Sequence, residues 1–159
     1  MGSTPFRFQA AFGFALIIAG FVFDFAFVTT PGNFAQSLQN QPASYVWTQY
    51  AYELTKFYLF VLGFSNLAQA LLIPRLPVNE ELVWTIFGLM AGGSTLFIAG
   101  GLWEARIGPV YRMEPPCYVL GAGLFAILAS LALEIYALVR SGGGESTSSG
   151  RRPALNSVR

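Results

Sequence analysis

Three charged side chains lie inside apolar segments at positions from which they could reach one another. Asp24 is about 8 Å inside the outer end of the first segment, counting about 1.5 Å per residue from Thr29. Glu53 and Lys56 are three residues apart in the next segment and share a helix face. Because charges within a membrane usually face the interior of a helix bundle, the spacing predicts a polar cluster of Asp24, Glu53 and Lys56 between two helices.

The chemistry open to this cluster is limited. A carboxylate beside a lysine could relay a proton or bind a polar solute, and charged residues inside membranes often mark function. The alternatives are a structural pair between helices, or a Lys56 side chain that extends its ammonium group to the wetted interface. The residue types favour the structural pair.

A second charged group follows the third apolar segment, on the same side of the membrane. It consists of Glu104, Arg106, Arg112 and Glu114. Arginine offers planar, bidentate donors, so two Glu–Arg pairs could clamp a lipid headgroup or the loop of a partner. A solvated hairpin is the simpler interpretation, and the sequence favours it.

A weaker polar layer is expected near the inner side. Glu134 lies about 8 Å from the inner end of the fourth segment, and Asn66 and Gln69 lie at comparable depth on the second. These three side chains predict a hydrogen-bonded network between the second and fourth helices, where such bonds contribute about 0.6 kcal/mol each. The alternative is a proton or solute path that connects this layer to the outer cluster.

Residue types that the chain lacks or contains only once restrict other chemistry. Histidine is absent, which removes the commonest general base and the commonest zinc and haem ligand. Cys117 is the single cysteine, so no intramolecular disulfide or CxxC motif exists. A net charge of +1 indicates no nucleic-acid partner. We expect no metal and no cofactor; an enzyme is the less favoured class, although acid–base chemistry at Asp24 or Glu53 stays open.

The elements that must position these residues are four apolar segments. Hydrophobic residues make up 54% of the chain and charged residues only 11%, against about 25% charged in soluble domains. The segments cover residues 8–29, 49–73, 82–103 and 117–139, each near the roughly 20 residues that cross a bilayer as a helix. The sequence predicts an all-α membrane protein: a four-transmembrane-helix bundle over residues 1–140 and a disordered tail over 141–159.

The placement of lysine and arginine predicts the orientation. The side of the two termini carries Arg7, Arg75, Arg140, Arg151, Arg152 and Arg159. The opposite side carries Lys56, Arg106 and Arg112. Because positive charge is enriched in cytoplasmic segments, both termini are expected in the cytoplasm. Small size and short loops favour the bacterial inner (plasma) membrane.

The third segment contains a row of small residues. The row consists of Gly88, Gly92, Thr95 and Ala99, at alternating helical spacings. Small residues let helix backbones approach closely in membranes. This row predicts helix packing, either within the bundle or against a second copy of the chain.

Together these features favour an accessory or scaffold component of a membrane assembly, without catalysis. Its partners would be membrane lipids and either further copies in a homo-oligomer or a larger membrane complex. The alternative is a small solute or proton-coupled transporter, or a lipid-binding protein, that uses Asp24, Glu53 and Lys56. A closed contact among these residues would indicate a structural role, whereas a cavity around them would indicate binding or transport.

Overall fold

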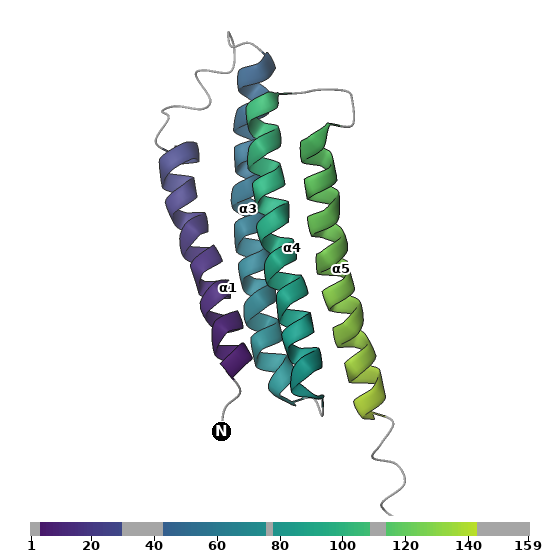
Figure 1. Cartoon of the computed structure of the whole chain (residues 1–159). Coiled ribbons are helices and arrows are strands. Elements are labelled where there is room, and N and C mark those ends of the chain that lie inside the picture. The colour runs from purple at the N-terminus through teal and green to yellow at the C-terminus, as the bar shows by residue number, and fades with distance from the viewer. Residues whose placement is uncertain (1–3, 30–42, 76–77, 109–113, 143–159) are drawn as a thin grey trace, which may run out of the picture.

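The computed structural model describes residues 4–29, 43–75, 78–108 and 114–142, and all regular structure in these ranges is helical (Figure 1). The four long helices are α1 (Thr4–Phe23), α3 (Ala43–Leu72), α4 (Glu80–Ile107) and α5 (Pro115–Gly142). α1 continues as a π-helix over Asp24–Thr29, and α3 ends in a 3-10 turn over Ile73–Arg75. The prediction of an all-α protein is confirmed.

Three of these helices are long and apolar enough to cross a membrane. They cover Pro5–Val28, Glu80–Ile107 and Pro115–Arg140. α3 is the longest at 30 residues, yet it is not among the candidate spans, because side chains such as Lys56, Asn66 and Gln69 lower its hydropathy. The chain is thus a helical protein with three apolar, membrane-length helices and a fourth, more polar one.

The helices extend beyond the apolar segments that predicted them. Asn79 caps the start of α4, where its side chain accepts a hydrogen bond from the Leu82 amide at 3.2 Å, and Gly108, whose φ is 90°, caps its C-terminal end. α5 starts at Pro115, where the missing proline N–H costs nothing. The predicted apolar segments do not include these terminal helical turns, because the turns contain polar residues. α5 continues to residue 142, so the predicted tail loses its first two residues to the helix; its remainder lies outside the described residues.

The four helices pack as two close pairs joined in the middle. α1 packs most extensively on α3, α4 packs most extensively on α5, and α3 lies against α4 (Figure 1). The first residues of α1 and the last residues of α5 lie at the same end of the bundle (Figure 1). We name this the Gln9 end and the opposite one the Asp24 end. One buried core cluster consists of Leu16, Leu59, Leu62, Met90 and Ile127.

Glycines set the closest approaches within each pair. A Cβ at Gly13 of α1 would lie 2.8 Å from the Gly63 carbonyl oxygen of α3. A Cβ at Gly123 of α5 would lie 2.6 Å from the Phe97 amide nitrogen of α4. Real Cβ atoms do not approach backbone atoms this closely, so both helix pairs require glycine at these positions.

The predicted small-residue row is not the packing face of α4 within the bundle. The exposed residues are Gly88, Gly92, Thr95 and Ala99. A Cβ at Gly88 or Gly92 would meet no atom within 4 Å. The buried glycines Gly93 and Gly100 contact α5 instead. Because α4 carries glycine on two faces, spacing alone could not identify the inner one; packing of the exposed row against a second copy stays a prediction.

Candidate functional site

The Asp24–Lys56 pair joins the start of the π-helix to α3. The Lys56 Nζ atom lies 3.0 Å from Asp24 Oδ1, and the two side chains are 28% and 35% exposed respectively. Glu53 is exposed and forms no ion pair with the described residues. Of the three residues in the predicted cluster, the structure therefore brings Asp24 and Lys56 into direct contact, whereas the Glu53 side chain is exposed.

The second charged group is only partly described, since Arg112 lies outside the described residues. Glu104 and Glu114 are partly buried, whereas Arg106 is exposed. Glu114 uses its backbone carbonyl to accept a hydrogen bond from the Cys117 amide at 2.9 Å. Within the described part of the chain, Glu104, Arg106 and Glu114 form no ion pair with one another, so the Glu–Arg clamp stays a prediction.

A buried hydrogen-bond network connects the four helices near the Gln9 end. Gln9 on α1 donates to the Gln69 side-chain oxygen on α3 at 2.6 Å. The Gln69 amide group donates to Glu134 on α5 at 3.0 Å and lies 3.4 Å from Ser130. The Ser130 hydroxyl donates to the Ile86 carbonyl of α4 at 2.9 Å. Gln69 therefore lies at the centre of a contact that includes every long helix.

Asn66 does not belong to this network, which corrects the predicted inner layer. Its amide group donates to the Leu62 carbonyl of its own helix at 2.8 Å. Gln9 takes the place expected for Asn66. One sequence feature could have identified Gln9 as part of the network: it is an amide residue near the end of an apolar helix, at the same depth as Gln69 and Glu134.

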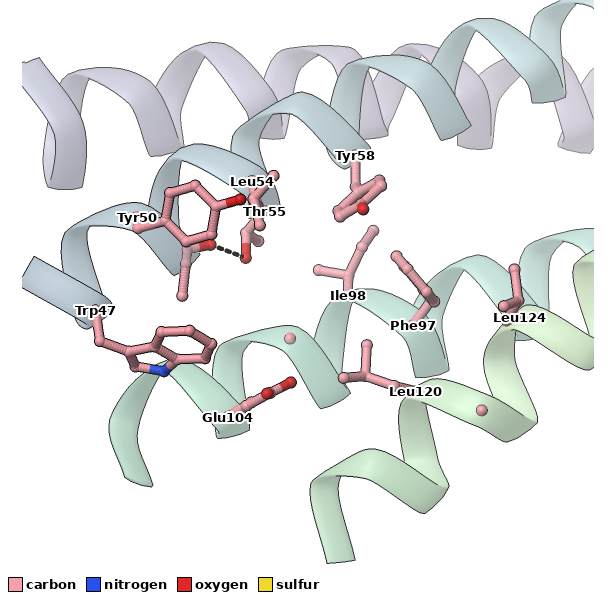
Figure 2. Close-up of a pocket in the computed structure, with 13 residues that line it drawn as sticks. Trp47, Tyr50, Leu54, Thr55, Tyr58, Phe97, Ile98, Glu104, Leu120 and Leu124 are labelled. Atoms are coloured by element: carbon pink, nitrogen blue, oxygen red, sulfur yellow. Dashed lines mark hydrogen bonds between the residues drawn. The ribbon is translucent and has the colours of Figure 1, made fainter. Parts of the chain in front are cut away.

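A mostly apolar cavity of about 260 Å³ lies between α3, α4 and α5 at the Asp24 end. Figure 2 shows Trp47 and Tyr50 of α3 at the same end of this cavity as Glu104 of α4, with Phe97 and Leu124 at the other. The cavity is thus polar at one end and apolar at the other.

The polar end of the cavity contains groups without partners. The Trp47 Nε1 atom is buried and has no hydrogen-bond acceptor among the described residues. The Glu104 carboxylate forms no ion pair there. By contrast, the Thr55 hydroxyl donates to the Ala51 carbonyl at 2.8 Å (Figure 2). The Glu104 side chain is only partly buried, so its unpaired carboxylate is available to the polar group of a bound molecule, whereas the Trp47 Nε1 atom is itself buried.

Among the described residues, Glu104 is the one predicted site residue that lines the cavity. Trp47 and Tyr50, which also line the cavity, are not among the site residues predicted from the sequence. Trp47, Leu54 and Tyr58 recur at helical spacing on α3, and this periodicity would have placed them on one face. With Glu104, these residues give the cavity aromatic rings, apolar surface and one carboxylate.

Comparison with known proteins adds no further constraint. Among the described residues, no group of three or more His, Cys, Asp and Glu side chains could bind a metal ion. No protein-family model, curated protein or solved structure matches the chain.

Proposed function

We propose that the chain is a four-span, non-catalytic component of a membrane assembly, located in a bacterial plasma membrane with both termini cytoplasmic. One observation carries this proposal: polar side chains in the helices bond helix to helix. Gln69 bonds to both Gln9 and Glu134, and Lys56 bonds to Asp24. Polar groups used in this way position helices, which is the role of a structural component.

The membrane crossing of α3 is supported by its length and its partners. At about 1.5 Å per residue, 30 residues extend about 45 Å, more than the roughly 30 Å of hydrocarbon in a bilayer. α3 runs beside α1 and α4 (Figure 1). Its Lys56, Asn66 and Gln69 side chains form hydrogen bonds inside the protein, as polar groups at membrane depth require.

The alternative of a transporter or lipid-binding protein acting through Asp24, Glu53 and Lys56 has less support. None of these three residues lines the cavity. The Asp24–Lys56 contact is direct, and Glu53 faces outward. A transport path would need these charges to surround a space that a solute can enter.

Cysteine labelling in intact cells is expected to detect the membrane crossings of α3 and α4. In a Cys117→Ser background, S44C and E114C should react with a membrane-impermeant maleimide, and V78C should react only after lysis. The reason is that residue 44 lies in the first turn of α3 and residue 78 follows its C-terminal end, so the two positions must lie on opposite sides if α3 crosses. Equal labelling of S44C and V78C would contradict the four-span proposal.

Breaking the Asp24–Lys56 pair is expected to weaken assembly rather than a transport activity. Lys56→Met should lower stability by about 1 kcal/mol or less, since the pair is partly exposed. Recovery of the tagged chain in particles larger than the monomer, after extraction of native membranes into nanodiscs, should fall. Glu53→Gln is the matched control and should change neither quantity. A wild-type chain found only as a monomer, or a stable Lys56→Met variant that abolishes proton-coupled flux in liposomes, would refute the proposed function.

A further inference from the structure

The cavity between α3, α4 and α5 contains a negative charge without a countercharge. Glu104 lines it and forms no ion pair with the described residues. Arg106 is exposed, and residues two apart on a helix do not face each other. Lys56 is already paired with Asp24. The local charge of this cavity is therefore complementary to a cation.

Aromatic rings surround the same end of the cavity. The Trp47 and Tyr50 ring centroids are 6.3 Å apart, with an interplanar angle of 45°. Both rings lie at the Glu104 end (Figure 2). Ring faces attract ammonium groups, most strongly where water is excluded. A carboxylate beside two electron-rich rings favours an organic cation over a neutral or anionic group.

The rest of the cavity fits one apolar chain. Its volume of about 260 Å³ lies just below the roughly 300–1,000 Å³ of drug-sized pockets. The lining extends from Trp47 to Tyr58, about 16 Å along α3 at about 1.5 Å per residue. Tyr50 and Gly121, which line the cavity, are also exposed, so it opens to the surface of the bundle. A single-chain molecule can enter from that side.

We propose that this cavity binds a single-chain lipophilic cation. The ammonium head lies between Glu104 and the rings of Trp47 and Tyr50, and the alkyl chain extends toward Phe97 and Leu124. This binding site goes beyond the proposed structural function and does not depend on it, because the contacts that carry that function, those of Gln69 and of the Asp24–Lys56 pair, involve no residue that lines the cavity.

The first test compares two ligands on the unaltered protein. Radiolabelled decyltrimethylammonium is titrated against the full-length chain in phosphatidylcholine nanodiscs, with empty nanodiscs as the correction for partition into lipid. We expect saturable binding at one site. Unlabelled n-decanol, which has the same chain but no charge, should displace the label at least about tenfold less effectively. Equal displacement by the neutral analogue, or no saturable binding, would overturn the proposal.

The second test uses matched pairs of variants, each checked for wild-type helicity and melting temperature. Glu104→Gln should weaken binding of the cation about tenfold. The affinity of n-decanol, measured by its competition with the cation that still binds, should stay unchanged. Glu53→Gln, which removes a carboxylate outside the cavity, should have no effect. A folded Glu104→Gln variant with wild-type affinity for the cation would overturn the proposal.

Filling the cavity provides an independent test that does not alter its charge. A Cβ at Gly121 would meet no atom within 4 Å, so Gly121→Leu can extend into the cavity without a clash at its Cβ. It should abolish binding of the cation. Gly92→Leu is the control, because Gly92 is equally open but does not line the cavity. Binding that survives Gly121→Leu would place the ligand elsewhere and refute the proposal.

Discussion

Gly123→Ala is expected to separate α4 from α5 and to destabilise the protein by about 3 kcal/mol, the upper range for an overpacked core. The added methyl group would lie 2.6 Å from the Phe97 amide nitrogen and 2.8 Å from the Gly93 carbonyl oxygen. Both are backbone atoms, so no side chain can rotate away to relieve the contact. Unfolding of the purified protein by titration with sodium dodecyl sulfate in mixed micelles would measure the change.

Gly121→Ala is the matched control, two residues earlier on the same helix. Its methyl group would meet open space, and alanine is favoured over glycine in helices by up to about 1 kcal/mol. Gly121→Ala should therefore be neutral or slightly stabilising. If the two variants unfold at the same detergent fraction, the α4–α5 contact is looser than the structure describes.

Gln69→Leu is expected to disconnect the buried network and to cost about 2–4 kcal/mol. The leucine would remove the side-chain bonds of Gln69 to Gln9, Glu134 and Ser130. It would leave the buried Gln9 amide and a buried Glu134 oxygen without that partner, and a buried unsatisfied polar group costs about 1–3 kcal/mol. The same unfolding titration measures the loss, and the yield of folded protein should fall with it.

Asn66→Leu separates this effect from the loss of a buried amide in general. Asn66 lies three residues from Gln69, is equally buried, and bonds only within its own helix through Leu62. Replacing it removes its polar atoms together with their need for partners, so the stability should change by less than about 1 kcal/mol. A loss as large as that of Gln69→Leu would show that the interhelical bonds are not the cause.

The elements of this fold could be predicted from hydropathy. Four apolar segments predicted four helices, although the fourth helix begins two residues before the predicted segment of residues 117–139. The Asp24–Lys56 contact could be predicted as well, since two opposite charges inside neighbouring apolar helices have few other partners. The first prediction succeeded because it depends on the composition of single helices. The second succeeded because two opposite charges within apolar helices are unfavourable unless they pair.

Features that depend on helix rotation could not be predicted in the same way. The inner face of α4 carries Gly93 and the outer face carries Gly92, and adjacent glycines give no hint of which one contacts α5. The same ambiguity placed Asn66 in the network instead of Gln9. The cavity arises from the relative position of α3, α4 and α5. The sequence of a single helix does not determine that position.

The central position of Gln69 also has a consequence for biosynthesis. As helices emerge from the ribosome in order, Gln69 can bond to Gln9 as soon as α3 is inserted beside α1. Its side-chain amide group can donate to Glu134 only after α5 has been synthesised, because Glu134 lies 65 residues later in the chain. If α3 crosses the membrane as proposed, a nascent chain that ends before α5 exposes an unsatisfied amide group to lipid, and such truncated products should be preferred substrates for membrane quality-control proteases.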